Sequence, residues 1–401
     1  MVITTSDDSP HQHQQRGASS STAQHVLRVV DLTTMRAAAA SLRAFGGSGE
    51  AAAAAELAAA TSSSQSDDNN NDLWTSTANA PSDPPLPIPY AAASALQEAL
   101  AEQLLRSTAA AAATTPTTST HHHTLLLLQH APVFTVGKRG RGHGFLSDEH
   151  MRAAMDAGAQ VDLESPRGGQ ATFHGLGQAV AYPVVCVRAL SLGARRYVEA
   201  LEDSAVRACG AWGVRAEGRQ PAGRTGVWAG GRKVAAVGVR VSLGVATHGL
   251  ALNVAGGAAA SGGKETVGDD GGALLGWFRL IDPCGLGGEV EGEGGDEGDD
   301  DADDDGVTTS LWRELGRRGA ESSSGGGWPS VRRVASDVAH ALASELGVHA
   351  VWPDGAAAAL DAADRGPPLP PEAARAVLEA LACAPAALSA RAPVVSVRRK
   401  V

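Results

Sequence analysis

Long runs of alanine, serine, asparagine and glycine interrupt this chain, and they limit how much of it can fold. The chain has 48 glycines but only 4% aromatic residues. Because alanine and glycine bury little area, such runs cannot build a hydrophobic core. We therefore predict a folded part much shorter than the 401 residues of the chain.

The interruptions define a domain layout. We predict a disordered N-terminus over 1–25, one folded domain over 26–350 and a peripheral tail over 351–401. Low-complexity insertions are expected inside the domain, over about 33–86, 107–122, 256–272 and 288–306.

The net charge of −11 comes from one segment. Glu289–Asp305 holds eleven acidic residues and no lysine or arginine, which leaves the rest of the chain close to neutral. The sequence contains no basic patch with interleaved aromatic residues, so we expect no nucleic-acid binding. The longest leucine run, Leu125–Leu128, is far too short to span a bilayer, so no membrane association is expected.

The four cysteines lie far apart and form no CxxC pair. This spacing matches neither a zinc site nor a disulfide framework, so we expect no metal and a reducing compartment. His121–His123 resemble a metal tract only by composition, and we interpret them as loop residues. The N-terminus lacks the apolar core of a signal peptide and makes only a poor transit peptide.

Strand and helix patterns alternate without a regular βαβ repeat. Val26–Leu32 and Leu125–Leu128 predict strands, and a pair of strands is expected to turn at Gly230-Gly231. Three helices are predicted: one beginning at Pro89 with the apolar stripe Ala93, Leu96, Leu100 and Leu104, one over Arg195–Cys209 ended by Gly210, and one over Val331–Leu346 ended by Gly347. This mixture predicts a single α+β domain.

Glycine-bracketed blocks carry the residues that can do chemistry. They are Arg167–Gly175 (RGGQATFHG), Gly231–Gly238 (GRKVAAVG), Asp282–Gly285 (DPCG) and Thr247–Gly249 (THG). Glycines beside histidine and arginine let backbone N–H groups approach a ligand closely, although each block can also be an ordinary turn.

Cys284 is the candidate nucleophile, because Pro283 and Gly285 favour a tight, exposed turn around it. A buried, unreactive thiol is the alternative, and we assign that role to Cys186, Cys209 and Cys383. A thiol attacks well at neutral pH only when a nearby cation lowers its pKa. Lys233, which opens an apolar strand, is one candidate for that cation, and His174 and His248 are the others.

Taken together and in order, these blocks resemble the lipoyl(octanoyl) transferase family. The matching segments include Pro89-Tyr90-Ala91, His130–Gly137, Arg167–Gln178, Gly226-Val227-Trp228, Gly231–Gly238, His248–Val254 and Pro283-Cys284-Gly285. The resemblance covers about residues 26–350, with Leu176 where the family usually has proline. It implies the α+β fold of biotin and lipoate protein ligases, in mixed sheets and helices.

The family's site residues transfer onto matching positions of this chain. Cys284 is the expected acyl-thioester nucleophile, and Lys233 is expected to lower its pKa. The residues expected to bind the acyl group are Arg167, Gly168, Gly169, Gln170, Ala171, Thr172, Phe173, His174, Ala236, Val237, Gly238, Gly249, Leu250 and Ala251.

The resemblance also implies partners. Octanoyl-acyl carrier protein is the expected donor, and lipoyl domains of 2-oxoacid dehydrogenases and of glycine cleavage H protein are the expected acceptors. Thioester exchange needs no ATP, so no cofactor is expected, and we expect a monomer. A role in lipoylation points to the mitochondrion, with the plastid as the alternative.

Two rival functions stay open at this point. An ATP-dependent lipoate or biotin protein ligase of the same fold would not need Cys284. A non-catalytic protein that binds lipoyl domains would need neither Cys284 nor Lys233.

Overall fold

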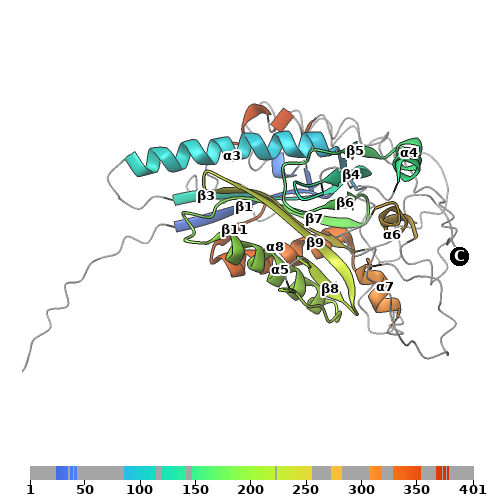
Figure 1. Cartoon of the computed structure of the whole chain (residues 1–401). Coiled ribbons are helices and arrows are strands. Elements are labelled where there is room, and N and C mark those ends of the chain that lie inside the picture. Colours follow the sequence, from blue (N-terminus) through green and yellow to red (C-terminus); the bar gives the residue numbers. More distant parts are fainter. Residues whose placement is uncertain are drawn as a thin grey trace, which may run out of the picture.

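A mixed β-sheet forms the centre of the molecule (Figure 1). The computed structural model describes residues 24–34, 37–38, 40–42, 85–113, 120–140, 147–221, 224–254, 272–281, 307–317, 328–353, 367–372, 374–375 and 377–378. The sheet order is β11 (His349–Val351), β1 (Gln24–Leu32), β3 (Thr120–His130), β7 (Gln178–Cys186), β10 (Val245–Asn253), β9 (Arg232–Ser242) and β8 (Val227–Ala229). The short strand β2 (Pro87–Ile88) pairs with β3.

The central sheet combines both kinds of strand pairing. Strand β1 runs parallel to β11 and β3, whereas β3, β7, β10, β9 and β8 pair antiparallel in that order. The sheet is therefore mixed, with its parallel pairs on one side and its antiparallel pairs on the other, which confirms the predicted α+β class with mixed sheets.

Helices cover both faces of this sheet. Helix α3 (Tyr90–Ala113) lies on one face, and α5 (Ala194–Ala211) and α8 (Val331–Leu346) lie on the other (Figure 1). Successive side chains of a strand point to opposite faces. In β3, Leu126 and Leu128 therefore pack toward α3, while Leu125 and Leu127 pack toward α5 and α8. The leucine run is apolar throughout because both faces of its strand are buried.

A second, smaller sheet stands beside the first. Its order is β5 (Gln160–Asp162), β4 (Val133–Val136) and β6 (Ala171–His174), and α4 (Asp148–Asp156) and α6 (Gly272–Phe278) accompany it. A third core forms where Phe134, Phe173 and Trp277 pack together, with the Phe173 and Trp277 rings stacked at 5.0 Å. The short helix α7 (Leu311–Gly316) follows a segment that returns to the central sheet at Val307.

The predicted helix patterns are confirmed. The stripe Ala93, Leu96, Leu100 and Leu104 is buried against the sheet. Helix α8 ends at Gly347, whose φ of +65° lies in the left-handed region. Gly230 and Gly231 form the predicted turn between β8 and β9. No helix in the described part of the chain is long and apolar enough to cross a bilayer.

Three sequence predictions need correction. The insertion expected over 107–122 is largely structured, since α3 continues to Ala113 and β3 begins at Thr120, so His121–His123 are strand residues rather than a loop. Gly210 lies inside α5 rather than ending it, because the helix continues to Ala211. The tail over 351–401 is not wholly peripheral: Leu369, Ala374 and Val377 are buried in the same core as the apolar stripe of α3.

Candidate active site

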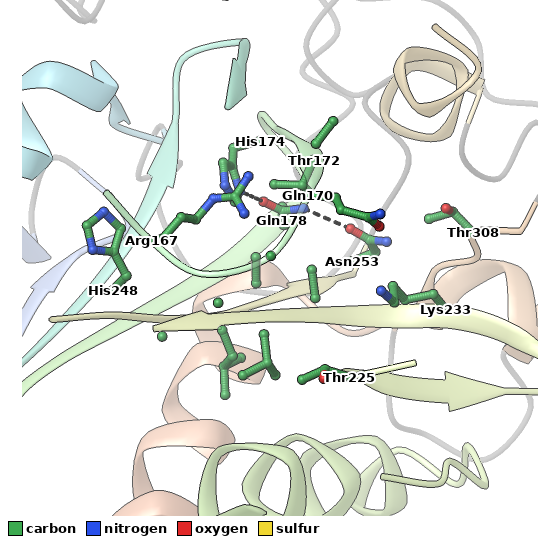
Figure 2. Close-up of a pocket in the computed structure, with 18 of the residues that line it drawn as sticks. Arg167, Gln170, Thr172, His174, Gln178, Thr225, Lys233, His248, Asn253 and Thr308 are labelled. Carbon is green, nitrogen blue, oxygen red and sulfur yellow. Dashed lines mark hydrogen bonds between the residues drawn. The ribbon is translucent and has the colours of Figure 1, made fainter. Parts of the chain in front are cut away.

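A cavity of about 150 Å³ lies between the central sheet and the segment leading into β6 (Figure 2). It is lined by Arg139, Arg167, Gly169, Gln170, Ala171, Thr172, His174, Gln178, Tyr182, Thr225, Lys233, Ala236, Val237, Gly238, His248, Gly249, Leu250, Ala251, Asn253, Phe278 and Thr308. Segments far apart in the sequence thus meet around one space.

Most residues predicted for the site line this cavity. Thirteen of the sixteen do so, including Lys233 and all three residues of each predicted segment on β9 and β10. Gly168 does not line the cavity, but its N–H bonds the Val239 carbonyl at 3.0 Å and seats the loop on β9. Phe173 points instead into the third core. Cys284 lies outside the described residues.

Arg167 is held inside the wall of the cavity and is only 6% exposed. Its guanidinium donates to the Thr135 carbonyl at 2.6 Å, to the Thr135 hydroxyl at 2.7 Å and to the Gly168 carbonyl at 3.0 Å. These hydrogen bonds fix the loop that follows Arg167. The backbone N–H groups of 137, 138 and 139 donate to carbonyls of that same loop, which makes it rigid.

A chain of side-chain hydrogen bonds crosses the cavity from β6 to β10. His174 Nδ1 lies 2.8 Å from Gln178 Oε1, and Gln178 Nε2 donates to Asn253 Oδ1 at 2.9 Å (Figure 2). Because the Gln178 amide nitrogen also donates to the Phe173 carbonyl, Gln178 Oε1 is the acceptor and His174 Nδ1 carries the proton. Asn253 completes the chain by donating to the Thr309 carbonyl at 2.9 Å.

Three histidines and two tyrosines pack together at one end of the cavity: Tyr90, His130, His174, Tyr182 and His248. Burial lowers the pKa of His130 to about 4 and that of His248 to about 3. Burial, reinforced by the charge of Arg167, also holds the pKa of His174 well below 6.5. All three rings are therefore neutral at physiological pH, and neither His174 nor His248 can supply the cation that a thiolate needs.

His248 has an unusual backbone for a residue inside a strand. Its φ of +60° is left-handed, and residues 247–249 form no pair with β7, where Pro183 offers no N–H. The Gln97 side chain of α3 accepts the His248 N–H at 2.6 Å instead, and Tyr90 bonds the ring at 3.1 Å. Helix α3 thus clamps β10 at this point.

Gly249 lets β10 approach β7 directly after that distortion. A Cβ atom at this position would lie 2.2 Å from the Ala181 carbonyl oxygen and 2.7 Å from Pro183 Cδ, which no real Cβ tolerates. Only glycine therefore permits this wall of the cavity to close.

Lys233 lies at the opposite end of the cavity from His248 (Figure 2). Its N–H donates to the Val307 carbonyl at 2.7 Å and its carbonyl accepts from Thr309 at 2.9 Å. The side chain is buried but lines the cavity beside Thr308. Because both histidines are neutral, Lys233 is the one left of the three cation candidates named from the sequence, and it lines the cavity.

Several lining residues were not predicted. Gln178 and Asn253 both belong to blocks that the sequence had singled out, so their hydrogen-bonding side chains were a usable signal. Thr225, Phe278 and Thr308 carry no such signal, because the fold alone brings them to the cavity. Within the described ranges, no three His, Cys, Asp or Glu side chains gather to hold a metal ion.

Comparison with known proteins identifies the family. The family model for the lipoyl protein ligase A/B catalytic domain matches residues 89–261. An octanoyltransferase of Rubrobacter xylanophilus is 39% identical over 193 residues, which cover 47% of this chain and 68% of that protein. Octanoyltransferase LIP2, mitochondrial, of Arabidopsis thaliana is 45% identical over 127 residues, covering 32% of this chain and 52% of that protein.

Among solved structures, the chain is similar to a putative lipoate protein ligase from T. acidophilum with bound lipoic acid. The TM-score is 0.42 at 11% identity, over 73% of this chain and 90% of that one.

The matched segment is a catalytic domain of the lipoyl protein ligase A/B type. The chain belongs to the octanoyltransferase family. It spans only about half the length of several curated relatives that it matches.

Proposed function

We propose that this chain transfers an octanoyl group from acyl carrier protein to a lysine of lipoyl domains, the first step of protein lipoylation, through a thioester on Cys284. The observation that carries the proposal is that Arg167, Lys233 and the small residues of β9 and β10 line one and the same cavity. Membership of the octanoyltransferase family supports the same reaction.

The cavity walls suit an unbranched acyl chain. Ala236 and Gly238 on β9 face Gly249 and Ala251 on β10 across paired backbone positions. Side chains this small leave a narrow slot between the strand and the loop at 167–170. His130 and His248, at the end of the cavity away from Lys233, are neutral. An acyl chain that enters there therefore does not have to displace water from a charged group.

The reaction balances without a cofactor. The Cys284 thiolate attacks the carbonyl carbon of the carrier thioester, the bond to the carrier's sulfur breaks, and that sulfur leaves as a thiolate. The acceptor amine then attacks the Cys284 thioester, forms an amide, loses a proton and releases the Cys284 thiolate. Lys233 stabilises the thiolate before the first step and after the second.

Chain connectivity supports the pairing of Cys284 with Lys233. Ile281, three residues before Cys284, is buried in the core that contains Phe278, a residue of the cavity wall. Three residues span at most about 11 Å, so the cysteine is tethered near the cavity. Farther along the chain, the Val307 carbonyl accepts the Lys233 N–H at 2.7 Å.

The proposed acceptors are lipoyl domains of 2-oxoacid dehydrogenases and of glycine cleavage H protein, and the proposed compartment is the mitochondrion. The named location of the Arabidopsis relative supports the compartment.

Intact-mass spectrometry of the full chain with octanoyl-acyl carrier protein, without ATP, tests the proposal. We expect one octanoyl adduct, which Cys284→Ser abolishes and the matched Cys383→Ser variant retains. Cys186 and Cys209 are buried, and burial raises the pKa of the Cys209 thiol to about 12, so neither should compete. Transfer that required ATP would indicate a ligase, and no adduct and no transfer would indicate a binding protein; either result would refute the proposal.

A further inference from the structure

Trp228 and Lys233 are direct neighbours in a short ladder of four backbone segments. Trp228 pairs with Lys233 across β8 and β9, next to an irregularity between Val227 and Trp228. On its other side Trp228 exchanges two backbone hydrogen bonds with Glu217, and Lys233 forms a bridge to Thr308. Residues directly opposite in paired strands project from the same face of the sheet. The ladder therefore sets the indole against the lysine side chain.

The indole ring lies close to the lysine charge. Lys233 Nζ is 5.2 Å from the centroid of the Trp228 ring, within the range of a cation–π interaction. Arg224 packs on the same ring at 4.2 Å. Trp228 is itself fixed, because it is 4% exposed and its Nε1 donates to the Arg224 carbonyl at 3.0 Å. Tryptophan offers a cation the strongest of the aromatic faces, and burial strengthens the attraction.

Gly226 provides room for the lysine stem. A Cβ atom at this position would lie 3.0 Å from Lys233 Cε and 2.6 Å from the Ala235 carbonyl oxygen. The backbone there has a φ of +131°, which side chains other than glycine rarely adopt. The Gly226-Val227-Trp228 segment therefore contacts Lys233 at two points: Gly226 leaves space for its aliphatic side-chain carbons, and Trp228 places an aromatic face near its ammonium group.

We propose that Trp228 is a positioning residue for Lys233, holding the lysine ammonium at the end of the cavity where the thiol acts. The inference rests on the proposed function and deepens it. Trp228 does not line the cavity, so it acts on the reaction only through Lys233. Loss of the indole leaves Lys233 in place along the backbone but removes the aromatic face against which its ammonium lies.

The test compares the pH dependence of Cys284 alkylation by iodoacetamide in the full-length wild type, Trp228→Phe and Trp228→Leu. Less contact between Lys233 and the thiolate raises the thiol's apparent pKa, so the alkylation profile moves to higher pH. We expect Trp228→Leu to lower the alkylation rate at pH 7 by about tenfold. Trp228→Phe, which keeps an aromatic face, should lose less, and octanoyl transfer should fall in kcat more than it rises in KM.

Trp312 supplies the matched control. It is also a packed indole outside the cavity lining whose Nε1 donates to a backbone carbonyl, that of Pro329 at 2.9 Å, but its ring packs against Trp328, with centroids 5.3 Å apart. Trp312→Leu and Trp312→Phe should leave the alkylation profile unchanged. If Trp228→Leu does not fold, Trp228→Phe decides alone: a profile identical to that of Trp312→Phe overturns the proposal.

A double-variant cycle separates positioning from a structural effect. In a Lys233→Met background, Trp228→Leu should produce no further shift in the alkylation profile, because the residue it positions is gone. An equal shift with and without Lys233 would also overturn the proposal. The alkylation assay does not depend on octanoyl transfer. If the wild type forms no octanoyl adduct, the proposed function is refuted, but the alkylation profiles still report whether Trp228 positions Lys233.

Discussion

Replacing Gln97 by leucine removes the side chain that clamps β10 at His248. Gln97 is almost fully buried on α3, and its Oε1 accepts the His248 N–H at 2.6 Å. Strand β7 offers no substitute, because the neighbouring stretch of β10 forms no pair with it. The substitution therefore leaves a buried donor without a partner.

The cost follows from that unpaired donor. A buried N–H left without an acceptor costs about 1–3 kcal/mol. Removing Gln97 Nε2, which finds no partner among the described residues, offsets part of the loss. We expect the free energy of unfolding to fall by about 2 kcal/mol.

Urea denaturation measures this difference. With a slope of about 1–3 kcal/mol per molar urea, a loss of this size lowers the midpoint by roughly 1 M. Gln103→Leu is the control, since it makes the same change on α3 at a solvent-exposed bond to the Pro368 carbonyl. Equal midpoints for the two variants would refute the clamp.

Three further predictions follow from other contacts. Gly249→Ala should abolish the folded state in thermal melts, because its Cβ would meet the Ala181 carbonyl at 2.2 Å, whereas Gly210→Ala, at an exposed position of α5, should leave stability equal or higher. Between pH 6.5 and about 4 the unfolded chain protonates His130 but the folded chain does not, so the free energy of unfolding should fall as pH falls through that window, less steeply in His130→Gln. Thr308→Val should raise the urea midpoint, because it removes a buried hydroxyl with no partner in the described part of the chain.

The local elements of the fold could be read from the sequence because their causes are local. The stripe Ala93, Leu96, Leu100 and Leu104 recurs at helical spacing, and Gly347 ends α8 through its own backbone freedom. Low-complexity composition was less reliable. Residues 107–113 continue α3 because alanine favours a helix, and 120–122 join β3 because β1 pairs with them.

Most of the candidate site was also predictable, since its blocks form a recognisable order along the chain. The residues by themselves offered Lys233, His174 and His248 as candidates for the cation beside the thiol, and the family resemblance favoured Lys233. The tertiary structure supplies the physical reason, because burial keeps both histidines neutral while Lys233 lines the cavity at the opposite end. The placement of Trp228 against Lys233, and of Gln97 against His248, was likewise decided by the fold. The sequence determines which side chains exist and which local elements form, whereas long-range pairing and desolvation determine which of them meet and which keep their charge.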